Sequence, residues 1–177
     1  AAGLLGTLAS GTEGKEEVRR EIVQAGAVEL LLALVQEGTD SGKEAAAGAL
    51  GNLASQEQDT IQFSMEQGAV ERLVALVSTG TEECKEVAAG ALMKLSASDN
   101  KSTKKAIVRA GAVGPLVVLL PTGTNVAKEY AVVALDNLTS GNQKTNVSAV
   151  LKAGAITQLV MLLRNAACTG ESKRAAA

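Results

Sequence analysis

The side chains that carry out most enzymatic chemistry are either missing from this sequence or badly placed for it. The 177 residues include no histidine. No nucleophile stands near a plausible base, and no carboxylate pair is isolated in an apolar segment. The two cysteines, Cys84 and Cys168, lie far apart and lack the spacing of metal ligands. The sequence therefore predicts no enzyme, no metal site and no bound cofactor.

Polar residues do recur at a fixed place in a phrase that the chain repeats. The phrase reads KEAAAGALGNLAS at 43–55, KEVAAGALMKLSA at 85–97 and KEYAVVALDNLTS at 128–140, and it places Asn52, Lys94 and Asn137 at equivalent positions. An asparagine amide offers both a donor and an acceptor to a peptide unit, whatever the side chain of that unit. Such residues suit non-covalent recognition. The Lys-Glu pair that opens each copy is interpreted as a solvated face.

A second recurring phrase sets the period of the chain. It reads AGAVELLLALVQEGT from residue 25, QGAVERLVALVSTGT from 67, AGAVGPLVVLLPTGT from 110 and AGAITQLVMLL from 153. Its glycines lie 42, 43 and 43 residues apart, at Gly26, Gly68, Gly111 and Gly154. This period is typical of helical solenoids. Apolar residues follow helical spacing within each unit, and no stretch shows sustained strand alternation.

Three helices per unit fit the pattern of glycines and threonines. The first helices are expected at 14–24, 58–66, 102–109 and 144–152, and the second at 28–37, 70–78, 113–120 and 156–165. The glycine between them can adopt the left-handed conformation of a helix C-cap. The third helix of each unit contains the phrase that begins with Lys-Glu. It can be N-capped by the preceding threonine, which is Thr39, Thr81 or Thr124. Its alanines let neighbouring helices approach closely, so that each unit buries its apolar face against the next.

Composition narrows the possible surroundings and partners. The chain is 46% hydrophobic with a net charge of −2, which predicts no general affinity for nucleic acid or an anionic membrane. The longest apolar run, AGAVGPLVVLLP at 110–121, is too short to span a bilayer. The unpatterned cysteines favour a reduced compartment, so we expect an intracellular protein, cytoplasmic and/or nuclear.

Each unit consists of a short helix, then the phrase AGAV..LV.LL..GT, then the phrase KE.AAGAL.NLAS. This order resembles the armadillo repeat over essentially the whole chain. The resemblance implies an all-α, right-handed solenoid of three-helix repeats, forming a single domain over 1–177. Its parts are expected at 1–10 (the C-terminal part of a third helix), 11–55, 56–98, 99–141 and 142–177 (a truncated repeat). Two-helix HEAT repeats are the near alternative, but they would not need the glycine break.

Armadillo proteins bind extended peptides in a groove lined by their third helices, where an asparagine hydrogen-bonds the ligand backbone. The resemblance therefore implies a non-enzymatic interaction scaffold whose partner is a protein or an extended peptide. The matching positions here are Thr7, Asn52, Lys94 and Asn137. Tyr130 lies at helical spacing on the same face, where an aromatic ring supplies contact area at low entropy cost.

This chain departs from the importin alpha pattern at the position four residues before that asparagine. Importin alpha has tryptophan there, forming pockets for basic ligand side chains, whereas this chain has Gly3, Gly48, Gly90 and Val133. We therefore do not expect a nuclear-import function. With Lys94 in the groove, acidic or neutral peptides are expected to bind better than lysine-rich ones.

Other interpretations of these residues remain open. Asn52 and Asn137 can instead bond an adjacent third helix and hold the stack in register. Lys94 can be a solvated residue, and Tyr130 can cover a gap left by small neighbours. The incomplete asparagine series favours a second functional class, a structural spacer within a longer array.

The two ends of the chain lead to an expectation of self-association. AAGLLGTLAS aligns with Ala46 to Ser55, and SKRAAA aligns with the front of a third helix, as in a segment of a longer array. Stacking faces without a neighbour are expected around Leu4, Leu5 and Leu8 at one end and around Leu159, Leu162 and Leu163 at the other. Head-to-tail association through these faces is expected, and a monomer with frayed ends is the alternative.

Overall fold

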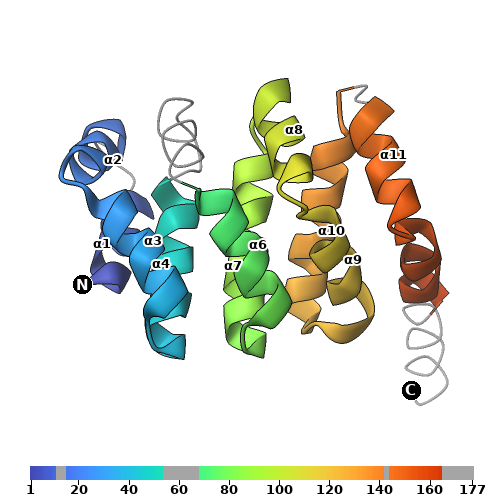
Figure 1. Ribbon diagram of the computed structural model, residues 1–177, viewed down its shortest axis with the longest axis horizontal. Coiled ribbons are helices and arrows are strands. Elements are labelled where there is room, and N and C mark those ends of the chain that lie inside the picture. Colours follow the sequence, from blue (N-terminus) through green and yellow to red (C-terminus); the bar gives the residue numbers. More distant parts are fainter. Residues whose placement is uncertain (11–14, 54–67, 142–143, 165–177) are drawn as a thin grey trace, which may run out of the picture.

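The chain folds as a row of stacked helices, as the period predicts. The computed structural model describes residues 1–177 except 11–14, 54–67, 142–143 and 165–177, and all regular structure in the described part is helical. The helices follow one another along the long axis, with α1 at one end of the row and the helix at Ala155–Arg164 at the other (Figure 1). The prediction of an all-α solenoid is confirmed.

The helices occur in the predicted order, and their ends agree with the expected ones to within one or two residues. They are α1 (Ala2–Ser10), α2 (Lys15–Gln24), α3 (Ala27–Glu37), α4 (Asp40–Leu53), α6 (Ala69–Thr79), α7 (Glu82–Ser96), α8 (Lys101–Arg109), α9 (Val113–Thr122), α10 (Asn125–Thr139), α11 (Lys144–Lys152) and a helix at Ala155–Arg164. Helix α9 runs two residues further than expected because Pro121 is accommodated in its last turn. The helix expected at 58–66 lies outside the described residues.

The glycine breaks have the geometry that the sequence requires. Backbone φ is +76°, +79°, +84° and +78° at Gly26, Gly68, Gly111 and Gly154, a region that favours glycine. The chain bends by 73° at the third of these turns and by 67° at the fourth. Among the described residues, no single helix is long and apolar enough to cross a bilayer; the only pairs that reach that length together are those bent at these two turns.

The threonines predicted to cap the third helices do so. The hydroxyl of Thr81 accepts from the backbone N–H of Cys84 at 3.3 Å, and that of Thr124 accepts from Ala127 at 3.0 Å. Thr39 accepts in the same way from Gly42 at 3.2 Å. Each cap satisfies a backbone donor in the first turn of its helix, which fixes where α4, α7 and α10 begin.

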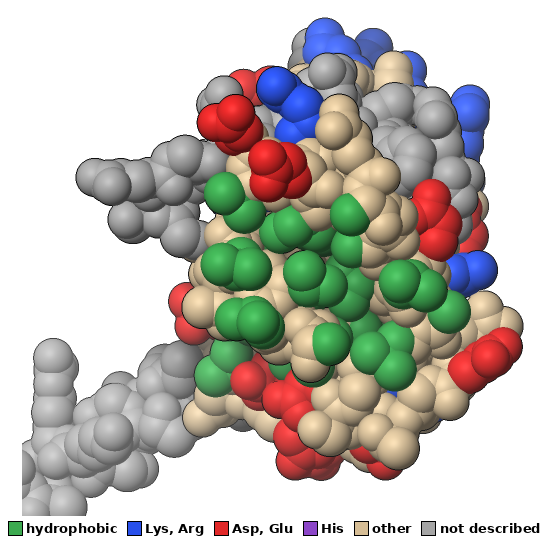
Figure 2. Space-filling view, turned by 90° about the vertical axis from the view of Figure 1, so that its left-hand side faces the viewer, with side chains coloured by type: hydrophobic (Ala, Val, Ile, Leu, Met, Phe, Trp, Pro, Cys, Tyr) green, Lys and Arg blue, Asp and Glu red, His purple; other side chains and the backbone are tan. Residues whose placement is uncertain are grey.

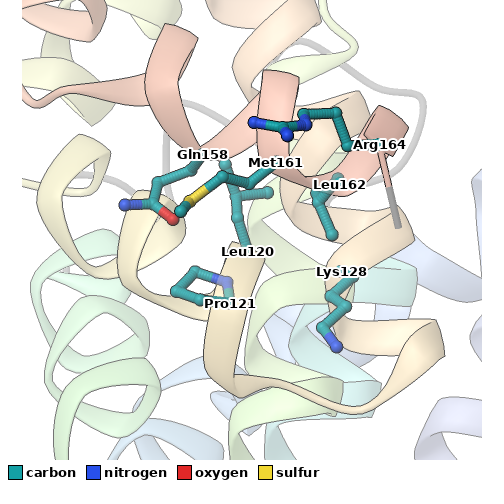
Figure 3. Close-up of a pocket in the computed structure, with 7 residues that line it drawn as sticks. All are labelled: Leu120, Pro121, Lys128, Gln158, Met161, Leu162 and Arg164. Carbon is teal, nitrogen blue, oxygen red and sulfur yellow. The ribbon is translucent and has the colours of Figure 1, made fainter. Parts of the chain in front are cut away.

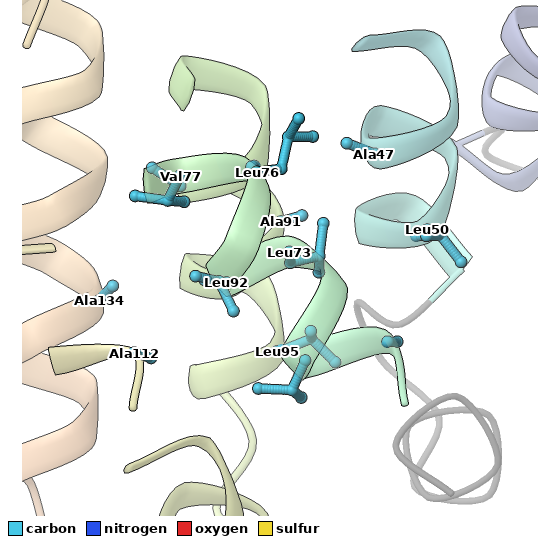
Figure 4. Close-up of a cluster of buried hydrophobic side chains, with 14 of the residues drawn as sticks. Ala47, Leu50, Leu73, Leu76, Val77, Ala91, Leu92, Leu95, Ala112 and Ala134 are labelled. Carbon is cyan, nitrogen blue, oxygen red and sulfur yellow. The ribbon is translucent and has the colours of Figure 1, made fainter. Parts of the chain in front are cut away.

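The core is a continuous series of leucine and alanine layers that run from unit to unit. Leu73 and Leu92 are fully buried between α6 and α7, and alanines such as Ala134 close the layer from the next unit (Figure 4). The third helices pack successively on one another, α1 on α4, α4 on α7 and α7 on α10. These four helices therefore form the face on which the predicted site residues lie.

Glycines set how closely the third helices approach. A Cβ atom on Gly51 of α4 would lie 2.9 Å from the Cα of Ala91 on α7, nearer than side-chain atoms come to a neighbouring backbone. A Cβ on Gly6 of α1 would lie 3.3 Å from the Cα of Ala49. Met93 occupies the equivalent position of α7, so the contact between α7 and α10 is built without this glycine.

Candidate functional site

The asparagine column connects each third helix to the one before it. The side-chain amide of Asn52 donates to the carbonyl of Gly6 at 3.0 Å. Lys94 Nζ donates to Asn52 Oδ1 at 2.5 Å. Asn137 donates to the carbonyl of Met93 and to the hydroxyl of Ser96, at 3.4 and 3.3 Å. The structure thus shows the register-holding contacts that one interpretation of the sequence anticipated.

Thr7, the first member of the column, differs from the other three. Its side chain is exposed, and its hydroxyl donates to the carbonyl of Gly3 in its own helix at 3.0 Å. Thr7 therefore makes no bond to another helix within the described part of the chain, and it is open to solvent on α1.

A hollow of about 240 Å³ lies where α4, α7 and α10 meet. Asn52, Lys94 and Tyr130 all line it, so the structure brings together three of the five residues predicted to bind a peptide. Thr7 and Asn137 do not line it. Glu86 does, and it was interpreted from the sequence as part of a solvated face. That interpretation is wrong for Glu86, which is half-buried and accepts a hydrogen bond from the hydroxyl of Thr124.

Tyr130 packs over Gly90 in the floor of this hollow. A Cβ atom on Gly90 would lie 3.0 Å from Cε2 of the ring, and one on Gly48 would lie 3.5 Å from a methyl group of Val87. Val87 and Tyr130 occupy the same position of successive repeated phrases. The glycines at the tryptophan positions therefore make room for a side chain from the next unit. Tyr130 fills this gap and also lines the hollow.

Comparisons with known proteins agree with this architecture. The family model described as Armadillo/beta-catenin-like repeat matches residues 15–55. An engineered protein of known structure superimposes with a TM-score of 0.85 at 32% identity, over 92% of this chain and 65% of the other. A designed armadillo repeat protein in complex with the peptide (KR)4 gives 0.83 at 31% identity, over 92% and 66%. The chain is therefore similar in fold to designed armadillo repeat proteins, and its residues 15–55 match the armadillo repeat family.

A third similar structure is described as that of computationally designed armadillo repeat proteins for modular peptide recognition. It superimposes with a TM-score of 0.82 at 30% identity, over 92% of this chain and 66% of the other. The chain thus spans about 65% of the length of the engineered protein. A search of the curated proteins found no significant match.

Two buried cations lie at the C-terminal ends of third helices. Arg19 is 3% exposed, and its Nε donates to the carbonyl of Ala9 at 2.8 Å. Lys104 is 5% exposed, and its Nζ donates to the hydroxyl of Ser140 at 2.6 Å. Neither has a carboxylate partner among the described residues. The negative end of a helix dipole stabilises a cation at these positions.

The positive charge of Arg19 also reaches the hollow. The pKa of Lys94 is lowered from its ordinary value, first by partial burial of the amine and second by repulsion from Arg19. Sequence reasoning overlooked Arg19, although a signal was available. Arg19 and Lys104 each stand the same distance before the glycine of the AGAV phrase, so a cation recurs at one position of two first helices.

The residues predicted for self-association divide into exposed and packed ones. Leu4, Leu8 and Leu163 are 65%, 49% and 71% exposed. Leu5, Leu159 and Leu162 are partly buried against the core. The N-terminal end of the row presents apolar side chains flanked mostly by acidic ones, with Lys and Arg side chains above and to the right in this view (Figure 2).

The opposite end of the described row contains a second hollow. It measures about 360 Å³ and lies between α9, α10 and the helix at Ala155–Arg164. Met161 and Leu162 line it together with two cations, Lys128 and Arg164 (Figure 3). None of the residues predicted to bind a peptide lies there.

Proposed function

We propose that this chain is a non-enzymatic protein-interaction scaffold that binds an extended peptide across α4, α7 and α10. The observation that carries the proposal is the 240 Å³ hollow, in which Asn52, Lys94 and Tyr130 from three successive third helices meet. The similarity to a designed armadillo protein in complex with a peptide, and to others designed for peptide recognition, supports it.

The proposed ligand is acidic or neutral overall. The pockets that would hold basic side chains are occupied, because Val87 and Tyr130 pack over Gly48 and Gly90. Lys94 adds a positive charge that makes no ion pair with a described residue. Complementary charge in a partly desolvated groove favours an anionic group of the ligand at Lys94.

Tyr130 provides a direct measurement of peptide binding at this site. It is the only tyrosine, and the chain has no tryptophan, so its fluorescence reports on the hollow alone. After an array screen, a soluble acidic peptide is expected to perturb Tyr130 emission. Lys94→Met is expected to weaken its binding about fivefold, since one partly exposed charge pair is lost. Added salt should weaken binding to the native chain more than binding to this variant.

Lys105→Met is the matched control, because Lys105 is exposed on α8 and does not line the hollow. It should leave the affinity unchanged. Equal loss in both variants, or tight binding of a lysine-rich peptide at physiological salt, would contradict the assignment of this groove.

A structural spacer is the second interpretation of the face formed by the third helices. The hydrogen bonds of Asn52, Lys94 and Asn137 to preceding third helices support it, since they hold the stack in register. The titration separates the two, because a spacer leaves Tyr130 emission unchanged with every peptide.

We further propose an intracellular location, which the buried, unpaired Cys84 supports.

Head-to-tail self-association is a second candidate, supported by the two ends of the row. One end combines exposed Leu4 and Leu8 with flanking acidic side chains, and the other combines Met161 with Lys128 and Arg164 (Figures 2 and 3). Apolar patches with opposite flanking charge favour a heterologous contact.

Sedimentation velocity over a concentration series measures this association. The weight-average sedimentation coefficient is expected to rise with concentration for the native chain and to stay constant for Leu4→Glu and for Leu163→Glu, because each places a charge in the contact. Val118→Glu is the control, since Val118 is 60% exposed on α9 but does not line the hollow at the C-terminal end. A single monomeric species throughout would refute end-to-end docking.

A further inference from the structure

The hollow between α4, α7 and α10 carries opposite charges toward its two ends. Lys94 and Glu86 both line it and both belong to α7. They are eight residues apart, which places them about 12 Å apart along the helix axis at a rise of 1.5 Å per residue. Tyr130 and Gly90 lie between them, in the uncharged middle of the hollow.

Neither charge is neutralised within the described residues. Lys94 Nζ donates to a neutral amide, that of Asn52, and the carboxylate of Glu86 accepts from a neutral hydroxyl, that of Thr124. Both side chains are half-buried. A charge in such surroundings attracts an opposite charge more strongly than a fully solvated one does, because water screens it less.

Arg19 strengthens the positive end. Its guanidinium is buried, and its Nη1 has no hydrogen-bond partner in the part of the chain that the structure describes. Arg19 acts on Lys94 through its charge, which contributes to the lowered pKa of that amine. A buried cation that has no counter-ion among the described residues is costly, and an anion bound near Lys94 reduces that cost.

We propose that this hollow binds an adjacent acidic and basic residue pair of an extended peptide, with the carboxylate at Lys94 and the cation at Glu86. Successive side chains of an extended chain point in opposite directions. Neighbouring glutamate and lysine residues therefore reach opposite ends of the hollow while the backbone crosses its middle, at Tyr130. This inference rests on the proposed function, since it specifies the peptide that the same groove selects.

Four fluorescein-labelled peptides with one otherwise uncharged sequence test the pairing. Their central dipeptides are Glu-Lys, Gln-Lys, Glu-Gln and Gln-Gln, and binding is measured by fluorescence anisotropy. We expect Glu-Lys to bind tightest, each single replacement to weaken binding about fivefold, and Gln-Gln to bind more than tenfold more weakly, in line with partly desolvated charge pairs.

Protein variants assign each charge to its end of the hollow. Lys94→Met should abolish the preference for Glu over Gln and keep that for Lys, and Glu86→Gln should do the reverse; a double-mutant cycle isolates these pairs. Arg19→Met should reduce the preference for Glu alone. Lys104→Met is its matched control, because Lys104 is a buried cation at the equivalent position of α8 and should leave both preferences intact.

Circular dichroism and thermal unfolding of every variant verify the fold. If Arg19→Met fails to fold, Lys94→Met and Glu86→Gln still test the pairing. Four peptides binding equally well to the native chain would overturn the charge pairing while leaving the peptide groove in place. Failure of all four to bind would overturn both proposals.

Discussion

Replacement of Gly51 by valine is expected to lower the free energy of unfolding by about 3 kcal/mol, at the upper end of typical overpacking costs. A Cβ atom at this position would lie 2.9 Å from the Cα and 3.0 Å from the Cβ of Ala91. The obstructing atoms belong to a helix backbone and cannot rotate away. Helices α4 and α7 must therefore separate, and urea unfolding monitored by circular dichroism measures the loss.

Gly48→Ala is the control on the same helix, one turn away. A Cβ there meets only a methyl group of Val87 at 3.5 Å, which is an ordinary contact. Alanine is a better helix former than glycine, so this variant is expected to gain up to about 1 kcal/mol. Equal effects of the two substitutions would show that helix propensity, not the distance between third helices, governs this position.

The separation of α4 from α7 has a second expected consequence, at the hollow. Asn52 follows Gly51 directly, and its Oδ1 is the acceptor for Lys94 on the other helix. Moving the helices apart stretches this hydrogen bond and widens the hollow. Because each unit of a solenoid contacts only its neighbours, the distortion should stay between α4 and α7 and leave the pairing of α7 with α10 intact.

The sequence predicts the helices well because their ends are determined by local chemistry. Gly26 needs only its own backbone to take a positive φ, and Thr124 caps a helix with a donor three residues away. Such signals repeat at every unit, so the period and the order of helices follow from the residues alone. The helix after Ser55 was expected on the same grounds and lies outside the described residues.

The contacts of the candidate site are not local, which is why the sequence leaves them open. Whether Asn52 points to a ligand or to Gly6 depends on the offset between α1 and α4. That offset follows from the close approach of small residues on both helices and cannot be obtained from one helix alone. The sequence identifies Tyr130 as a groove residue, but its packing over Gly90 appears only once α7 and α10 are side by side.

Arg19 and Glu86 show the same limit for charged residues. A charged residue in a helix is solvated in most proteins, so the general expectation places both in water. Arg19 is buried because the last turn of α1 supplies a carbonyl to its guanidinium. Glu86 is half-buried because Thr124 of the next unit approaches it. Ala9 lies ten residues before Arg19 and Thr124 lies 38 residues after Glu86, so neither contact is made within one helix.

Asn52→Ala is expected to destabilise the fold by about 2 kcal/mol, within the usual cost of leaving buried polar groups without partners. The substitution removes the donor to the carbonyl of Gly6 and the acceptor of Lys94 together. Both partners lie on other helices, so the loss weakens two successive contacts between units. Urea unfolding of the variant gives the free energy.

Asn137→Ala is the matched comparison, because Asn137 occupies the equivalent position of α10. Its two hydrogen bonds, at 3.4 and 3.3 Å, are longer than the 3.0 Å bond from Asn52 to Gly6. Among the described residues, no cation donates to the side-chain oxygen of Asn137. Its replacement should therefore cost less, about 1 kcal/mol. An equal or larger loss than for Asn52→Ala would contradict the importance of the contact with Lys94.

Stability and peptide affinity must be measured on the same two variants, because the asparagines hold the stack together whether or not they also contact a ligand. If Asn52 acts on the ligand as well, Asn52→Ala should weaken peptide binding by roughly 0.5–2 kcal/mol at temperatures where the variant is fully folded. Asn52→Asp separates the two effects, since it keeps an acceptor for Lys94 and loses the donor to Gly6. Native affinity in a folded Asn52→Ala variant would leave Asn52 with a structural role only and would assign ligand recognition to Lys94, Glu86 and Tyr130.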